Sequence, residues 1–110
     1  MNLLITAHHF QLTPAIRQYV EEKVERLTRH FDEVREIEVV LVVEENADKD
    51  RRQRAEMNVR VKGDTLHGQS DAQDIYAALD SVLEKMDRQV ARYKDKVQDH
   101  NNTAVKHLQP

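Results

Sequence analysis

A chain of 110 residues, 39% hydrophobic and 34% charged, has room for one compact domain, and its formal net charge of −3 argues weakly against a polyanionic partner. The absence of cysteine excludes a disulfide framework and a thiolate zinc site. No apolar run approaches the roughly 20 residues that cross a bilayer, and the N-terminus lacks a secretion signal, so we expect a cytoplasmic protein with no membrane partner.

The chain opens with a predicted strand and a predicted helix. The apolar run of residues 3–7 is typical of a strand. The helix runs from Pro14 to Phe31, because Thr13 is a suitable N-cap and proline suits the first helical position. Its apolar residues recur at helical spacing and predict one buried face: Ile16, Val20, Val24, Leu27 and Phe31.

Three strands are predicted in the middle of the chain. The segments EIEVVLVVEE (36–45) and RAEMNVRVK (54–62) flank a charged turn, and the second alternates apolar and polar residues cleanly. Such alternation predicts a sheet with one buried and one solvent-exposed face. Gly63 and Asp64 predict a tight turn before a last strand, TLHGQS (65–70), in which Gly68 indicates a bulge or a close backbone approach.

The second predicted helix spans residues 70–100. Ser70 or Asp71 can cap it, and Asp71 and Asp74 suit the positive end of the helix dipole. Its apolar stripe consists of Ile75, Leu79, Val82, Met86, Val90, Tyr93 and Val97. Residues 101–110 are polar and aperiodic, so we expect a domain of residues 1–100 followed by a flexible tail.

The element order β-α-β-β-β-α defines the expected fold class. We expect an α+β domain with a four-stranded mixed sheet and two helices packed on one face, as in double-stranded-RNA-binding domains. The first two strands are expected to be parallel through a right-handed crossover, and the last three antiparallel through tight turns.

Basic residues gather on one flank of each predicted helix. On a wheel of about 100° per residue, the second helix has a band about 80° wide beside its apolar stripe, made of Lys85, Arg88, Arg92 and Lys96. The first helix has a similar flank with Tyr19, Lys23, Arg26 and His30. Charged flanks are commonly only solvated, but a band of bases can also span successive phosphates of a nucleic acid. The wheels leave both interpretations open, and they do not determine whether the two flanks bound one surface.

The sequence gives little support for catalysis or metal binding. His8 and His9 are neighbours, so on a strand they point to opposite faces and do not easily chelate one metal. His67 has no evident catalytic partner, and no catalytic triad order, phosphate-cradling glycine loop or H-E-x-x-H motif occurs. Tyr76 is a minor candidate for stacking on bases. We therefore expect a protein that is not an enzyme and holds no cofactor or metal.

The second predicted helix resembles that of the ribosome hibernation promoting factor family. The resemblance lies in the run DIYAALD (74–80) and in the later residues Leu83, Lys85, Met86, Arg88, Gln89, Val90 and Lys94 to Lys96. The segments LTPAIRQYVEEKVERL (12–27) and LHGQSDAQDIY (66–76) also resemble the family, so the similarity covers about residues 2–97. The family includes a stationary-phase translation inhibitor, and its fold has the element order expected above.

The resemblance implies a non-enzymatic, stress-related silencer of translation that binds the small ribosomal subunit and intact ribosomes. Such proteins occupy the path of tRNA and mRNA between the head and body of the small subunit, where basic residues of both helices contact rRNA. Carried over by position, the implied rRNA-binding residues are Lys23, Arg26, Lys85, Arg88 and Arg92, and Lys96 extends the same band. Arg92 stands where lysine is common in the family, so charge is kept but a planar fork replaces a point charge.

Two departures from the family pattern bear on the interpretation. The connector ENADKDRRQR (45–54) is long and basic, so Arg51, Arg52 and Arg54 either add contacts or only improve solubility. The chain ends without the dimerisation domain of the long form, and its tail lacks acidic character. This favours the short form, monomeric off the ribosome, which promotes ribosome pairing together with a separate small modulation factor.

A general double-stranded-RNA-binding module is the alternative from another class. Such modules usually carry a basic cluster at the N-terminus of the second helix, whereas this end carries Asp71 and Asp74. The acidic end argues against that alternative, and the lack of a catalytic constellation argues against a small enzyme.

Overall fold

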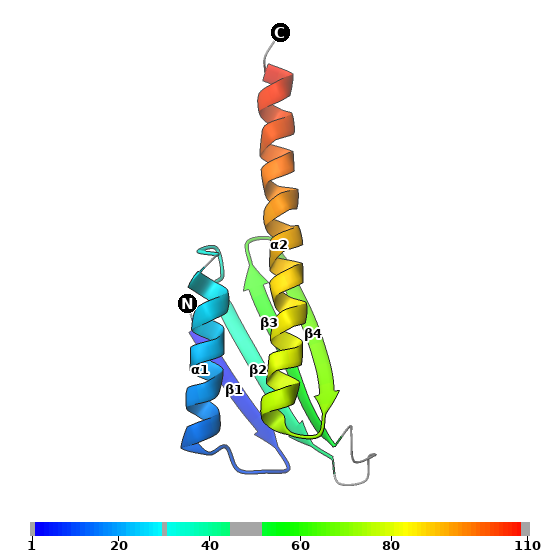
Figure 1. The fold of residues 1–110 in the computed structure, drawn as a ribbon. Coiled ribbons are helices and arrows are strands. Elements are labelled where there is room, and N and C mark those ends of the chain that lie inside the picture. The colour runs from blue at the N-terminus through cyan, green and yellow to red at the C-terminus, as the bar shows by residue number, and fades with distance from the viewer. Residues whose placement is uncertain (1, 30, 45–51, 109–110) are drawn as a thin grey trace.

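The fold is a four-stranded sheet with two helices on one face (Figure 1). The computed structural model describes the backbone of residues 2–29, 31–44 and 52–108, with side chains as far as Val97. The elements are β1 (Asn2–His8), α1 (Pro14–Arg29), β2 (Glu36–Val43), β3 (Gln53–Val61), β4 (Asp64–Ala72) and α2 (Ile75–Leu108). The predicted fold class and element order are therefore confirmed.

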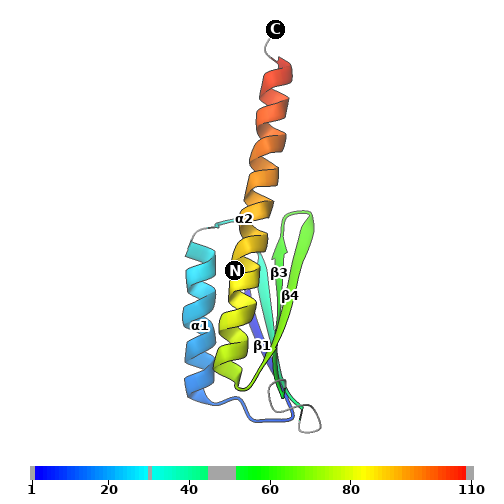
Figure 2. The ribbon, with the colours of Figure 1, turned by 45° about the vertical axis from the view of Figure 1, so that its right-hand side comes forward.

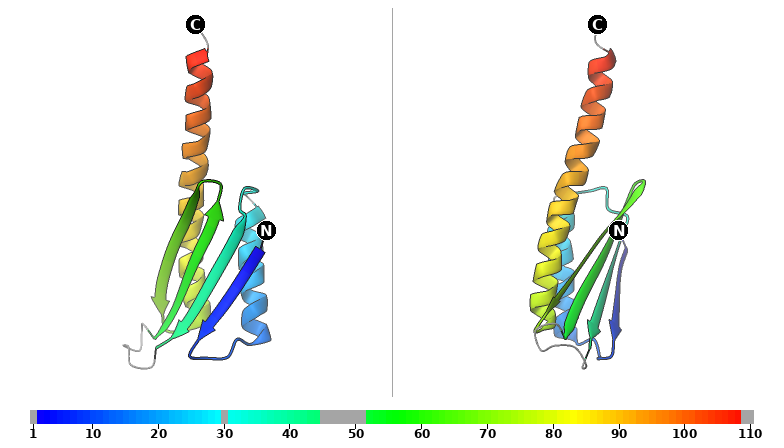
Figure 3. Two further views of the ribbon diagram at one scale, coloured as in Figure 1. Left: turned by 180° about the vertical axis from the view of Figure 1, so that it is seen from behind. Right: turned by 90° about the vertical axis from the view of Figure 1, so that its right-hand side faces the viewer.

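The strands lie in the sheet in chain order, β1-β2-β3-β4. β1 pairs with β2 in parallel, and β2–β3 and β3–β4 are antiparallel, as the short connections predict. Gly63 adopts a φ of 79° in the turn between β3 and β4, a conformation that glycine takes without steric cost. Figures 2 and 3 show that both helices cover the same face and leave the other face of the sheet open.

The core lies between the two helices and the covered face of the sheet. The alternating residues of the strands supply its floor, and Ile37, Val39 and Leu41 have no exposed surface. The apolar stripes of the helices supply its roof, with Val20, Val24, Leu27, Leu79, Val82 and Met86 fully or almost fully buried. Both predicted stripes thus face the core, and the charged flanks beside them are left at the surface.

The helix caps agree with the sequence prediction at α1 and differ at α2. At α1 the backbone N–H of Ile16 donates to Oγ1 of Thr13 at 3.2 Å, which confirms the predicted N-cap. At α2 the N-cap is Asp74, whose Oδ1 accepts from the N–H of Ala77 at 2.8 Å. The prediction of Ser70 or Asp71 as cap is wrong because β4 continues to Ala72 and includes both residues.

The two helices end at different places from those predicted. α1 ends at Arg29, slightly before Phe31. α2 continues to Leu108, so the prediction that it ends near His100 is wrong. No glycine or proline interrupts residues 101–108, and the helical hydrogen-bond ladder can continue there. Flexibility of residues 101–110, and the division of the chain into a domain and a tail, stay predictions.

Candidate nucleic-acid interface

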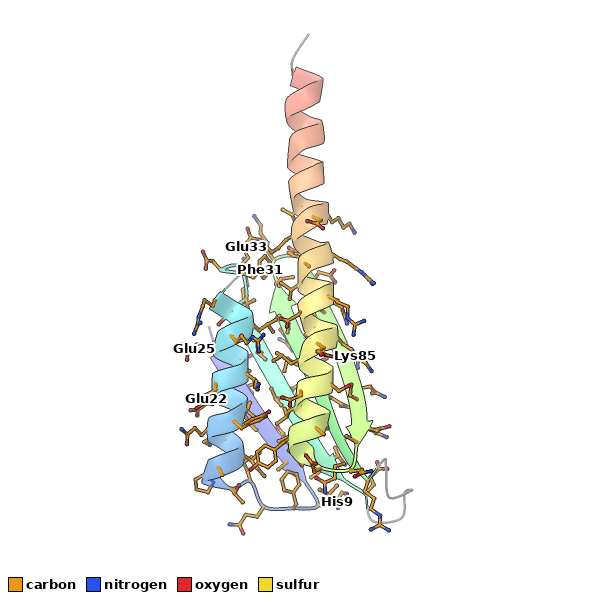
Figure 4. The ribbon with its side chains drawn as sticks, viewed as in Figure 1. His9, Glu22, Glu25, Phe31, Glu33 and Lys85 are labelled. Atoms are coloured by element: carbon orange, nitrogen blue, oxygen red, sulfur yellow. The ribbon has the colours of Figure 1, made fainter. Side chains whose placement is uncertain are left out.

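Four exposed bases line the side of α2 that faces β4. Lys85 extends toward the strand (Figure 4), and its Nζ donates to the backbone carbonyl of Gln69 at 2.7 Å. Arg88 stays on its own helix, where its Nε donates to the carbonyl of Glu84 at 3.4 Å. The remaining two bases, Arg92 and Lys96, line a hollow of about 320 Å³ between α2 and β4, together with Asp64, Leu66, Gln89 and Tyr93. We call these four bases the β4-side flank.

Contacts with the edge of the sheet hold the β4-side flank in place. Nε2 of Gln89 donates to the carbonyl of His67 at 2.6 Å. One turn further along the helix, the hydroxyl of Tyr93 donates to the carbonyl of Lys62 at 2.8 Å. With Lys85, three side chains of α2 therefore donate to backbone carbonyls in β4 and the turn before it, which fixes the rotation of the helix.

Gly68 allows α2 to lie close to β4. A Cβ added at this position would lie 2.8 Å from Sδ of Met86 and 3.5 Å from Cγ2 of Val82, closer to the sulfur than real side chains come. The strand register continues through Gly68, which is paired with Met57. The sequence left a bulge and a close approach open, and the structure shows the close approach.

The bases of α1 lie in a different setting, between the two helices. Nζ of Lys23 lies 3.6 Å from Oδ1 of Asp80 on α2, and the Lys23 side chain is 26% exposed. The same nitrogen lies 5.1 Å from the centre of the Tyr19 ring. Arg26 lines a hollow of about 340 Å³ with residues of both helices, among them Asp87 and Lys94. We call Lys23 and Arg26 the interhelical pair.

Asp80 links the two helices through Tyr19 as well. The Tyr19 hydroxyl donates to Oδ1 of Asp80 at 2.5 Å. This hydrogen bond, with desolvation and the charge of Asp80 adding to it, raises the pKa of Tyr19 from 10.0 to about 12. The rings of Tyr19 and Tyr76 also make an edge-to-face contact, with their centres 4.9 Å apart. Tyr76 is 40% exposed.

The structure does not bring the two groups of bases together on one continuous surface. The interhelical pair faces the side of α2 that carries Asp80 and Asp87, whereas the β4-side flank lies on the other side of the same helix. An RNA that contacts both groups must therefore cross a line of carboxylates on α2. Along α2 the bases of the β4-side flank follow one another without an acid among them, although Asp64 lines the hollow beside Arg92 and Lys96.

The structure places only part of the basic connector. Arg51 lies outside the described residues. Arg54 is described and belongs to β3, where its Nε lies 3.0 Å from Oδ1 of Asp71 and its side chain also reaches Glu44 at 3.7 Å. Asp71 and Glu44 therefore offset the charge of Arg54, which points to the open face of the sheet, away from the helices.

The family comparison covers almost the whole chain. Residues 3–98 match the model of the family described as "Sigma 54 modulation protein / S30EA ribosomal protein". The chain belongs to this family. The family match confirms the resemblance seen in the sequence, since relatives in this family carry the name "Ribosome hibernation promoting factor".

Relatives of this S30EA family extend the likeness to sequence and structure. A "Ribosome hibernation promoting factor" of Klebsiella oxytoca is 37% identical over 91% of this chain and 100% of its own length. Another from Azotobacter vinelandii is 36% identical over 87% of this chain and 85% of its own. The solved N-terminal domain of Thermus thermophilus Protein Y is 34% identical, with a TM-score of 0.72 over 84% of this chain and 99% of that one. A ribosomal subunit interface protein from Coxiella burnetii has a TM-score of 0.75 and 25% identity over 86% and 99% of the two chains.

The structure shows no cluster that would suggest other chemistry in the part of the chain that it describes. Within those residues no three His, Asp or Glu side chains are grouped so that they could hold a metal ion. His67 has a partner that the sequence did not reveal, because its Nδ1 lies 2.5 Å from Oδ1 of Asn58 on the neighbouring strand. No helix among the described residues is both long and apolar enough to cross a membrane.

Proposed function

We propose that this chain is a ribosome hibernation factor that binds the small ribosomal subunit in the cytoplasm and silences translation without catalysing a reaction. The observation that carries the proposal is the match to the S30EA family over residues 3–98, with relatives named for ribosome hibernation. The mechanism is steric: the bound protein fills the path of tRNA and mRNA, so ribosomes stay inactive. In this proposal the chain promotes pairing of inactive ribosomes together with a separate small modulation factor.

The contact with rRNA is assigned mainly to the β4-side flank. Lys85, Arg88, Arg92 and Lys96 are exposed, and three turns of one rigid helix present them on one side. Each base that neutralises a phosphate releases a counterion, so binding is favoured and becomes dependent on salt. Lys23 and Arg26 contribute less in this proposal, since Asp80 and Asp87 lie beside them.

The general double-stranded-RNA-binding module finds no support in the structure or in the relatives. The N-terminus of α2 carries Asp74 as its cap, and Asp71 beside it pairs with Arg54. Carboxylates at this end of the helix repel phosphates, where such a module would need bases.

Sedimentation with purified ribosomal subunits tests the proposed function. We expect the chain to sediment with small subunits and intact ribosomes but not with isolated large subunits, and to exclude initiator tRNA from the small subunit. Equal recovery on large subunits would contradict the location, and full simultaneous occupancy by the chain and initiator tRNA would contradict steric exclusion.

Two neighbouring residues of α2 form a matched pair of variants for the same assay. Arg88→Ala removes an exposed base and leaves the core untouched, so folding should change by no more than about 0.5 kcal/mol. Ribosome binding should weaken, and its salt dependence should become shallower by about one unit, because one phosphate is no longer neutralised. Asp87→Ala, on the interhelical side, should leave binding nearly unchanged. Wild-type affinity and salt slope in folded Arg88→Ala would remove Arg88 from the interface.

A further inference from the structure

The outer edge of β1 carries backbone groups that face away from the rest of the sheet. β1 is the terminal strand and pairs only with β2. The N–H of Asn2 donates to the carbonyl of Arg35, so Asn2 and every second residue after it direct their backbone groups toward β2. The backbone groups of Leu3, Ile5 and Ala7 then point outward. Within the described residues, no hydrogen bond reaches them from another segment.

The opposite edge of the sheet is protected, and β1 is not. On β4 the carbonyls of His67 and Gln69 accept hydrogen bonds from Gln89 and Lys85 of α2. Proteins commonly protect edge strands with charges, proline or bulges, and residues 2–8 (NLLITAH) contain no lysine, arginine, acid or proline. Leu4, on the open face of the sheet, is 49% exposed. The edge of β1 is therefore open to pairing with a further strand.

The residues on the open face beside β1 indicate which charge is favoured in an added strand. Across the sheet, Leu4 lies beside Glu38, which lies beside Asn58 and then His67. Oε1 of Glu38 accepts from Nδ2 of Asn58 at 3.0 Å, which keeps the carboxylate within this row, on the side away from Leu4. No lysine or arginine belongs to the row.

A basic side chain beside Leu4 on an added strand would meet both an apolar and an acidic group. Neighbouring strands lie about 4.8 Å apart, so Glu38 is about 10 Å from such a strand. Lysine and arginine can lay their alkyl stems over an apolar side chain while the charged head reaches further. The stem would cover Leu4, and the charged head would point toward Glu38, whose negative charge would attract it across the remaining distance. A phosphate or an acidic side chain at this place would be repelled.

We propose that an extended polypeptide segment containing lysine or arginine binds along the outer edge of β1 as an additional strand. Its main chain pairs with Leu3, Ile5 and Ala7, and one of its basic side chains lies over Leu4 and points toward Glu38. Strand addition is a common mode of peptide recognition, in which main-chain hydrogen bonds give affinity and alternate side chains give specificity. The site lies at the sheet edge and does not depend on the β4-side flank of α2.

Amide exchange of the full chain with a defined peptide tests this proposal. The probe is a short synthetic peptide of alternating arginine and valine, and a peptide of alternating glutamate and valine is the control. We expect the arginine peptide to slow exchange at Leu3, Ile5 and Ala7 by about tenfold or more at saturation, with no change in β4. Unchanged exchange at these three amides, or equal protection by the glutamate peptide, would overturn the proposal.

Variants on the open face separate the contribution of the strand edge to peptide binding from the contribution of the Glu38 charge. Leu4→Lys places a like charge on an already exposed position and should abolish binding of the arginine peptide while the chain stays folded. Glu38→Gln keeps an acceptor for Asn58 and should weaken binding of the arginine peptide, because the attracting charge is lost. Glu56→Gln changes the charge of a neighbouring row and should bind as the wild type does.

Two further measurements test whether a second copy occupies the edge and whether peptide binding is independent of the β4-side flank. Concentration-dependent dimerisation without peptide, with protection of the same three amides, would mean that a second copy occupies the edge and would overturn the proposal. Arg88→Ala should bind the arginine peptide as tightly as the wild type does, since it lies on the other side of the sheet. Peptide binding measured without ribosomes can therefore fail or succeed independently of the proposed hibernation function.

Discussion

The two groups of bases on the helices arise from the same sequence pattern and lie in opposite surroundings. The β4-side flank of α2 faces backbone carbonyls of a strand and a hollow that contains only one acid, Asp64, among the described residues. The interhelical pair, Lys23 and Arg26, faces Asp80 and Asp87 across the gap between the helices. A base beside a carboxylate already has a counter-charge, so it gains less from a phosphate than a base that has none.

The comparison shows that position on a helix does not by itself predict availability for a ligand. In both helices the bases lie beside the apolar stripe, where long side chains cover part of the core and reach the surface. Their availability depends on the element that packs against that flank. α2 provides acids on the side that faces α1, while β4 presents carbonyls that take up only part of the hydrogen-bonding capacity of the bases.

Removing each group of bases separately should give the largest contrast. We expect the triple variant Arg88→Ala, Arg92→Ala and Lys96→Ala to lose about a hundredfold in ribosome affinity at about 0.1 M salt, and its salt slope to become shallower by about three units. The double variant Lys23→Ala and Arg26→Ala should change the slope by less than about one unit. Co-sedimentation at several salt concentrations measures both slopes. Equal slopes in the two variants would end the distinction between the two groups.

A larger side chain at Gly68 tests whether close packing of α2 on β4 stabilises the fold. In Gly68→Val the added Cβ would lie 2.8 Å from Sδ of Met86, a core side chain with no exposed surface. We expect a loss of about 2–3 kcal/mol in the free energy of unfolding, as for other overpacked cores. Urea denaturation measures the loss.

A glycine of the neighbouring turn provides the control. Gly63→Asn introduces a residue that tolerates the left-handed conformation, and no atom lies within 4 Å of the added Cβ. The loss in the free energy of unfolding should therefore be much smaller than for Gly68→Val. If Gly68→Val were as stable as the wild type, α2 would not be held closely on β4.

Much of the fold could be predicted from the sequence because its signals are local. Thr13 and Pro14 mark the start of α1, and the alternation of Ala55, Met57 and Val59 gives the buried face of β3. The cap of α2 could not be predicted in the same way. Ser70, Asp71 and Asp74 are all suitable caps, and the choice depends on how far β4 pairs with β3, which is a tertiary property.

The sequence could predict which flank of each helix carries the bases, but not what packs against that flank, and rRNA binding by these residues stays a prediction. The wheel placed Lys85 and Arg92 correctly beside the core of α2, yet it contains no information on what packs against that side. Gln89 was overlooked as an anchor, although it follows Lys85 by four residues and so lies on the same side of the helix. The sequence groups Lys23 with the exposed bases, because its partner Asp80 is far away in the sequence and near only in the folded chain.

Breaking the link between the helices should have a smaller effect than displacing α2. Tyr19→Phe removes the hydrogen bond to Asp80 and should cost about 1 kcal/mol at neutral pH. The folded state raises the pKa of Tyr19 from 10.0 to about 12, so it holds the proton more tightly than the unfolded chain does. The contribution is therefore complete below about pH 10 and is lost as the pH rises toward 12.

The pH dependence of unfolding separates the contribution of the Tyr19–Asp80 hydrogen bond from the titration of the other tyrosines. The wild type should lose more stability than Tyr19→Phe between pH 10 and 12, since Tyr76 and Tyr93 are present in both proteins and cancel in the difference. Denaturant unfolding at a series of pH values gives the two curves. Parallel curves would show that Asp80 does not hold the Tyr19 proton.

The smallest effect is expected from the interhelical base itself. Lys23→Met keeps an unbranched side chain over the Tyr19 ring and removes only the charge that pairs with Asp80 at 3.6 Å. An ion pair with one partner half exposed contributes about 0.5 kcal/mol, so the loss in unfolding free energy should be of this size and should vanish at high salt. Ribosome affinity should stay within about twofold of the wild type, because the Lys23 charge is already offset by Asp80. A loss of affinity as large as that of Arg88→Ala would mean that Lys23 leaves Asp80 when RNA binds, and the two groups of bases would then act as one surface.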